Sequence, residues 1–65
     1  MDQILEFGYV NYRGEYSVRR VIPWHVWFGA TEYHTEPQWF LRAWDEDKDD
    51  YRDFAMNDMC LSRPD

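Results

Sequence analysis

Short segments rich in aromatic and β-branched residues, separated by turn signals, constrain this chain more than any other feature of its sequence. Such segments favour β-strands. No stretch of about ten residues repeats its apolar side chains with the helical period of 3.6, so we expect neither an all-α nor a βαβ fold. The predicted strands are Ile4–Arg13, Tyr16–Ile22, Trp24–Phe28, Gln38–Trp44 and Tyr51–Ala55.

Turn residues separate these segments. Gly14 stands where a tight hairpin needs a positive φ angle. Pro23 lacks an amide donor and is expected to interrupt the ladder. An acidic run, Asp45–Asp50, predicts the last turn, Met56–Leu61 predicts one helical turn, and Ser62–Asp65 predicts a frayed end. The whole pattern predicts an all-β fold: a small five-stranded antiparallel barrel of the SH3-like or Sm-like kind, with a short C-terminal helical turn.

The chain length of 65 residues allows a single domain, residues 1–65. Its 13 aromatic residues must supply most of the core, since only nine residues are Val, Ile or Leu. Ordering a chain of this size costs roughly 1.5 kcal/mol per residue. We therefore expect no spare mass for a substrate cavity, and no enzyme activity.

Several protein classes are excluded by the sequence. A single cysteine, Cys60, cannot form an internal disulfide, so a stapled secreted miniprotein is not expected. No signal peptide and no apolar run long enough for a membrane span are found. We expect a cytoplasmic, folded bacterial protein that does not contact a membrane.

The charge is unevenly distributed. The net charge of −6 divides into −1 over residues 1–42 and −5 over residues 43–65. The acidic residues of the second part lie mostly in Asp45–Asp50, a run that is typical of a solvated turn. Six of the seven basic residues are arginines, whose planar guanidinium groups pair with phosphate or carboxylate and stack on rings.

Both faces of the third and fourth predicted strands carry rings. Strand alternation puts Trp39 and Leu41 on one face and Phe40 and Trp44 on the other. It likewise groups a second set of apolar residues on one face of the third strand: Trp24, Val26 and Phe28. One face fills the interior, so the outward rings are expected to be covered by the chain itself, a second subunit or a ligand.

Five short elements, in order, resemble the WYL domain family over residues 10–59. Trp39-Phe40-Leu41 stands where the family has its Trp-Tyr-Leu signature. The remaining elements are the opening hairpin, the Arg-x-x-Pro element, the Ala-x-Asp after the signature and the late Arg-x-Phe. In this chain they are Tyr12–Ser17, Arg20–Pro23, Ala43–Asp45 and Arg52–Phe54.

The resemblance implies a barrel that senses a nucleotide or nucleic-acid fragment and regulates transcription or phage defence. The resemblance also assigns a ligand-binding role to five residues of this chain: Tyr12, Ser17, Arg20, Trp39 and Arg52. Arg20 and Arg52 would clamp phosphate, and Trp39 would support or stack a base. Tyr12 and Ser17 would supply hydrogen bonds.

The chain also departs from the family pattern. Phe40 replaces the middle Tyr of the signature, and the net charge disfavours an anionic ligand. No helix-turn-helix is expected, so direct sequence-specific DNA binding is not implied. Arg20 and Arg52 could instead form ordinary surface salt bridges, each contributing about 0–1 kcal/mol.

An alternative function is protein interaction without a nucleotide ligand. In that case the outward rings and the acidic hairpin would contact a partner protein or a second copy of the chain. A structural cap in a larger assembly is a third possibility.

No metal or cofactor is expected. His25, His34 and Cys60 are too scattered to form a zinc site. The acidic run is a turn, which is poor support for paired catalytic carboxylates.

Overall fold

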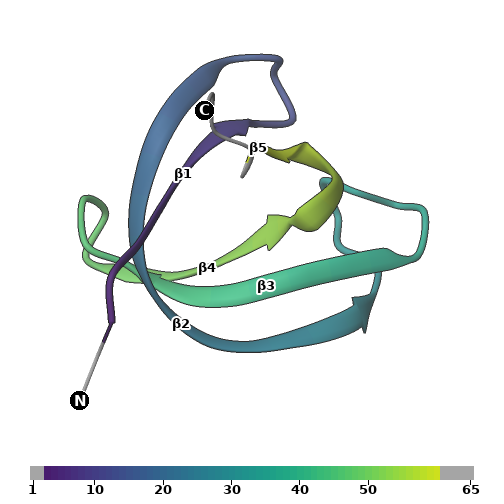
Figure 1. Ribbon diagram of the computed structural model, residues 1–65. Coiled ribbons are helices and arrows are strands. Elements are labelled where there is room, and N and C mark those ends of the chain that lie inside the picture. Colours follow the sequence, from purple (N-terminus) through teal and green to yellow (C-terminus); the bar gives the residue numbers. More distant parts are fainter. Residues whose placement is uncertain (1–2, 61–65) are drawn as a thin grey trace.

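The computed structural model describes residues 3–60, which form one five-stranded antiparallel sheet (Figure 1). The elements are β1 (Leu5–Val10), β2 (Tyr16–Gly29), β3 (Gln38–Asp45), β4 (Asp50–Ala55), the 3₁₀ helix η1 (Met56–Asp58) and β5 (Met59–Cys60). The strand order in the sheet is β4-β3-β2-β1-β5. The predicted all-β class with antiparallel strands is therefore confirmed. The predicted frayed end, residues 62–65, lies outside the described residues.

Strand β2 corrects the predicted division at Pro23. It is one continuous strand of 14 residues, with a register shift between Pro23 and His25. Its first half pairs with β1 and its second half pairs with β3. A proline is tolerated in this position because the second half of β2 has a neighbour on one side and is therefore an edge. The proline bends the strand with a bulge instead of ending it.

The two outer strands of the sheet, β4 and β5, are not joined by a ladder in the described part of the chain. The predicted barrel closure is therefore not confirmed, and the SH3-like or Sm-like type stays a prediction. Figure 1 shows instead that the sheet curls, so that β1 passes across it. A side-chain contact links β1 to β4, since the Phe7 ring of β1 lies 5.3 Å from the Phe54 ring of β4.

The core lies on the concave face of this curled sheet. Its buried members come from β1, β2, β3 and β4, and they are Phe7, Tyr9, Val21, Leu41, Ala43 and Phe54. Three aromatic rings meet edge to face with centroids 5.0–6.2 Å apart, the arrangement that the ring quadrupole favours. Aromatic residues therefore supply three of the six core members, whereas seven other aromatic side chains are exposed.

Outside the core cluster, the chain covers only some of the aromatic and apolar side chains of β2 and β3. Phe40 is fully buried because Trp27 stacks on it at 4.8 Å and the His34 ring packs against its edge. Four other apolar side chains on β2 and β3 stay more than half exposed: Trp24, Val26, Phe28 and Trp39. The bulge also separates Trp24 from Val26 and Phe28, which alternation had grouped together. Trp24 contacts Tyr51 instead, 4.9 Å between ring centroids.

The predicted helical turn over 56–61 is shorter in the structure. Residues 56–58 form η1, and Met59 and Cys60 pair with Tyr9 and Gly8 as β5. Residue 61 lies outside the described part. Within residues 3–60, no helix has the length and apolar character needed to cross a membrane.

Candidate functional site

A pocket of about 400 Å³ opens between the β1–β2 turn, the β2–β3 connection and the free edge of β4. We call it the β1/β4 pocket. Its lining residues are Tyr9, Asn11, Tyr12, Arg19, Thr31, Glu32, Tyr33, His34, Tyr51, Arg52, Asp53 and Phe54. This volume is within the range of about 300–1,000 Å³ found for small-molecule sites. The expectation that so short a chain lacks such space is wrong, because the pocket lies where the sheet stays open and not inside the core.

Arg19 forms part of the pocket lining and reaches into the interior. Its side chain is only 11% exposed, and its guanidinium carbon lies 5.9 Å from the Tyr9 ring centroid and 5.8 Å from that of Phe54. Desolvated cation–π contacts of this kind contribute up to about 2 kcal/mol. Arg19 Nε is buried and has no hydrogen-bond partner within residues 3–60. The aromatic core therefore holds a positive charge next to the pocket.

Asp45 balances the charge of Arg19. The Arg19 Nη1 donates to Asp45 Oδ2 at 3.3 Å, and Asp45 is fully buried. The other carboxylate oxygen, Oδ1, accepts from the backbone N–H of Asp47 at 3.0 Å. One residue of the predicted acidic turn is therefore a buried structural group, whereas residues 46–50 are exposed.

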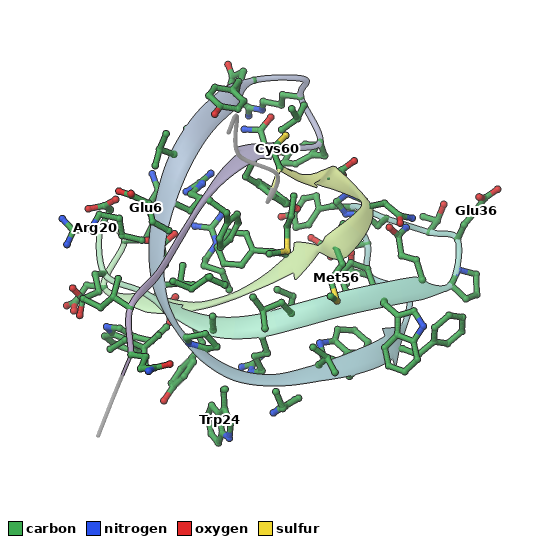
Figure 2. All side chains as sticks on the ribbon, in the orientation of Figure 1. Glu6, Arg20, Trp24, Glu36, Met56 and Cys60 are labelled. Atoms are coloured by element: carbon green, nitrogen blue, oxygen red, sulfur yellow. The ribbon has the colours of Figure 1, made fainter. Side chains whose placement is uncertain are left out.

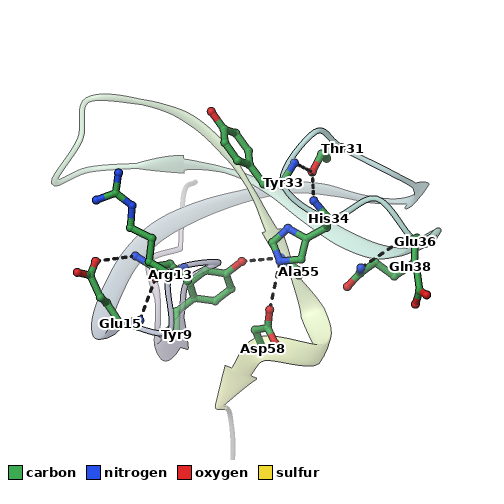
Figure 3. Close-up of polar contacts among 11 residues, drawn as sticks. Tyr9, Arg13, Glu15, Thr31, Tyr33, His34, Glu36, Gln38, Ala55 and Asp58 are labelled. Carbon is green, nitrogen blue, oxygen red and sulfur yellow. Dashed lines mark hydrogen bonds and ion pairs between the residues drawn. The ribbon is translucent and has the colours of Figure 1, made fainter.

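Tyr9 ties β1 to the end of β4. The backbone N–H of Ala55 donates to the Tyr9 hydroxyl at 2.9 Å, a contact drawn in Figure 3. Burial raises the pKa of Tyr9 above its ordinary value, although the Ala55 hydrogen bond opposes this. The hydroxyl satisfies a backbone donor on the open edge of β4, and this contact replaces a ladder bond at that point.

Two tyrosines from different loops stack at the pocket mouth. The rings of Tyr12 and Tyr33 lie 4.7 Å apart with planes inclined by 29°. Tyr12 belongs to the β1–β2 turn, in which Asn11 Oδ1 accepts from two backbone N–H groups and Gly14 has a φ of 81°. The predicted positive φ at Gly14 is confirmed. Hydrogen bonding to Glu32 raises the pKa of the Tyr33 hydroxyl.

His34 anchors the β2–β3 connection, which forms one pocket wall. Its Nε2 lies 3.3 Å from Asp58 Oδ2 of η1, and its backbone N–H donates to Thr31 Oγ1 at 3.0 Å (Figure 3). Tyr33 donates its backbone N–H to the same hydroxyl oxygen, at 3.2 Å. Thr31 and Asp58 therefore fix the loop that presents Tyr33 to the pocket.

Arg52 and Asp53 line the β4 side of the pocket and differ in their partners. Asp53 accepts from Trp27 Nε1 at 2.9 Å and from Arg42 Nη1 at 3.1 Å, so its charge is already paired. Arg52 is exposed and forms no ion pair among residues 3–60. The unpaired charge on this wall is therefore positive.

The structure brings together two of the five residues that the sequence predicts for the site. Tyr12 and Arg52 line the β1/β4 pocket. Ser17 lines a shallower depression between β2 and the acidic turn. Arg20 is exposed, lies opposite Glu6 in the β1–β2 ladder and points away from the sheet in Figure 2. Trp39 is 54% exposed beside Phe28 and lines neither pocket. The expected meeting of Arg20, Arg52 and Trp39 on one side is therefore wrong.

Arg19, the neighbour of Arg20, is the residue that sequence reasoning missed. Strand alternation puts Arg20 on the same face as Val18, and Val18 is 51% exposed in the structure, so this face is not the core face. The signal that identifies Arg19 is the hairpin register. The turn pairs Val10 with Tyr16, which puts Arg19 opposite the buried Phe7. One residue of strand slip exchanges the two faces, so the choice between adjacent arginines depends on that register.

The pocket residues can bind a ligand through a charged group and through aromatic rings. Among residues 3–60, no three His, Cys, Asp or Glu side chains gather in a way that could hold a metal ion. The pocket combines arginine with exposed tyrosine rings, which suit an anionic ligand with a planar part, and the carboxylate of Glu32 also lines it.

Comparison with known proteins gives one match. The sequence model of the WYL domain family matches residues 1–61 of the 65. No curated protein and no solved structure matches the chain. WYL domains are generally regulatory domains that sense a ligand. Because the match covers nearly the whole chain, the protein belongs to the WYL domain family.

Proposed function

We propose that the chain is a regulatory module that binds a nucleotide or a short single-stranded nucleic acid in the β1/β4 pocket. The proposal assigns the pocket a binding role and no catalysis. The single observation that carries it is that Arg52, which forms no ion pair within residues 3–60, lines the same pocket as the stacked pair Tyr12 and Tyr33.

Arg52 is the phosphate-binding residue in this proposal. It is the pocket arginine without an ion pair in the described part of the chain, so a phosphate need not displace a carboxylate to reach it. A guanidinium group offers paired donors that fit phosphate oxygens. Arg19 lines the same pocket, but its charge is already balanced by Asp45.

Tyr12 and Tyr33 are the base-stacking residues. Both side chains are more than half exposed, so each ring has surface open to a base, and the Arg13 guanidinium carbon lies 5.7 Å from the Tyr12 ring centroid. Stacking of a base on an aromatic ring contributes about 1–3 kcal/mol and accepts any base. The ligand would therefore be selected by its phosphate and planar ring more than by its sequence.

Ligand state would pass to the rest of a regulatory system through the β2–β3 connection. This segment carries Tyr33 into the pocket and continues directly into β3. His34 and Asp58 join it to η1, so a shift of Tyr33 on binding would also move that contact. The proposed role is in transcription or phage-defence regulation.

The test is a binding titration with a defined probe, a 5′-phosphorylated thymidine trinucleotide carrying a 3′ fluorophore, followed by anisotropy. Arg52→Ala should weaken binding about tenfold, which equals about 1.4 kcal/mol. It should also reduce the slope of log K against log salt by about 0.7, the value for one phosphate contact on a single strand.

Arg20→Ala is the matched control, because it removes an exposed strand arginine that lies outside the pocket. It should change the affinity less than twofold. Equal losses in the two variants would show that the charge acts in a general way and that the pocket is not the site.

Docking of another protein is a second candidate function, and one observation favours it. Val26, Phe28 and Trp39 are each more than half exposed and lie on one face of the neighbouring strands β2 and β3. Contiguous exposed apolar side chains often mark protein interaction sites. These residues lie outside the β1/β4 pocket, so both functions could reside in one molecule.

A further inference from the structure

The second half of β2 is an unpaired strand edge in the described part of the chain. Residues 16–21 pair with β1, but β1 begins at Leu5 opposite Val21. From Ile22 to Gly29 the ladder of β2 runs along β3 alone. Figure 1 shows this segment as the outer rim of the sheet, below β3 in that view. We call Ile22–Gly29 the β2 edge.

Ladder alternation identifies which backbone groups point outward. The N–H of Ala55 donates to Tyr9 and not to β3, so the facing pair Phe40–Ala55 is not hydrogen-bonded. Antiparallel pairs alternate between bonded and non-bonded. The backbone groups of Phe40 therefore point to β2, where Trp27 faces them.

The neighbours of Trp27 then point the opposite way. Val26 and Phe28 each have one N–H and one C=O directed away from β3, into the space beside the β2 edge. The ladder over 25–29 has no further register shift, so the alternation holds throughout this segment. A strand placed there would find two donors and two acceptors spaced as an antiparallel partner requires.

The β2 edge carries three apolar side chains that are more than half exposed, Trp24, Val26 and Phe28. Val26 is 51% and Phe28 57% exposed, and Trp39 packs beside Phe28 at 5.4 Å between ring centroids. On the other face of the sheet, Trp24 is 61% exposed and points outward in Figure 2. A strand added at this edge would cover apolar surface on both faces.

The β2 edge also lacks the charges that normally protect strand edges. Between Val21 and Thr31 the only ionisable side chain is that of His25. Pro23 and its bulge protect the start of the edge, but residues 26–28 carry no lysine, proline or bulge. An apolar edge of this kind pairs readily with another strand.

We propose that the β2 edge pairs antiparallel with the same edge of a second copy of this chain, forming a twofold dimer with a continuous sheet. The twofold axis lies at Trp27, so that Val26 faces the partner's Phe28. A self-paired edge meets no like charge, although the chain carries −6. Antiparallel pairing also puts Glu32 and Glu36, which follow the strand, at opposite ends of the interface from their copies.

The first test is the molar mass of the 65-residue chain, measured by light scattering across a concentration series. The expected result is a dimer, twice 8.1 kDa, at micromolar concentration. Val26→Lys puts a charge at the centre of the proposed interface and should raise the dimer dissociation constant at least about 100-fold. A parent chain that is monomeric at about 200 μM would overturn the proposal.

Val18→Lys is the matched control. Val18 is also a valine on β2 and is also 51% exposed, but it lies in the half that pairs with β1. This variant should dimerise like the parent, and circular dichroism of both variants checks that they fold. If Val18→Lys weakens the dimer as much as Val26→Lys, then charge alone disperses the copies and the edge is not the interface.

Hydrogen exchange of single amides gives a second readout that needs no variant. The amides of Val26 and Phe28 should exchange slowly at high protein concentration and about tenfold faster on dilution into the monomer range. A dimer in which these two amides exchange rapidly would assign the interface elsewhere. A monomer that gains protection there only with an added lysine-rich strand peptide would assign the edge to a different partner. Either result would overturn self-pairing.

Discussion

The two halves of β2 have the same backbone conformation and different surroundings. The half that pairs with β1 presents Arg19 and the fully buried Val21 to the core. The half that pairs with β3 keeps Val26 and Phe28 more than half exposed. The bulge after Pro23 separates them. One strand thus supplies both a pocket residue and a free edge, and local sequence preference alone does not distinguish the two.

The difference between the halves should be largest in stability. Phe7→Ala removes a buried ring packed against Phe54 beside the first half and should lower the free energy of unfolding by about 3–5 kcal/mol. Phe28→Ala removes an exposed ring from the second half and should cost below about 1 kcal/mol. Urea unfolding of both variants measures this, at a concentration where the parent is monomeric. Similar losses in the free energy of unfolding would contradict the proposed difference between the two halves of β2.

The charge pair beside the first half gives the next largest effect. Asp45→Asn keeps an oxygen for the turn but leaves Arg19 without its buried counter-charge, and should cost about 1.5–3 kcal/mol. Asp50→Asn, an exposed residue just beyond the same turn, is the control and should change stability by below about 0.5 kcal/mol. Chemical denaturation measures the free energy of unfolding of both variants. Equal losses in the free energy of unfolding would mean that the Arg19–Asp45 pair does not stabilise the fold.

A smaller effect should come from Tyr9 at high pH. Burial raises the folded-state pKa of Tyr9 above 10.0, so its contribution to stability is complete below pH 10 and declines as the pH rises through the folded pKa. Tyr9→Phe leaves the Ala55 N–H unsatisfied and should cost about 1–3 kcal/mol at pH 7. The gap between parent and variant should narrow above pH 10. Thermal melts from pH 7 to 11 measure it, and a gap that widens would contradict the account.

Much of the fold could be predicted from the sequence because short-range signals were strong. The strand predicted over Gln38–Trp44 is β3, which is one residue longer, and Gly14 forms the turn expected of it. Pro23 was misread because a proline interrupts a central strand but is accepted at an edge. Whether a segment is central or at an edge depends on the pairing of distant strands, which no local pattern contains.

The candidate site was harder to predict for the same reason. Tyr12 and Arg52 come from segments far apart in sequence that the curled sheet brings to one pocket. Arg20 and Arg19 are adjacent, so their faces are exchanged by a single step in register. Trp39 was selected through the family signature, but its ring lies beside Phe28 on exposed surface. Its role as a ligand residue stays a prediction without support from the pocket geometry.

The most direct test of the proposed binding site is amide chemical-shift mapping with the unlabelled 5′-phosphorylated thymidine trinucleotide. The account predicts saturable shifts at Tyr12, Tyr33 and Arg52, with the signals of Arg20 and Trp39 unmoved. Shifts confined to Arg20 and Trp39, or no shifts at millimolar probe, would contradict the assignment of the β1/β4 pocket as a nucleotide site.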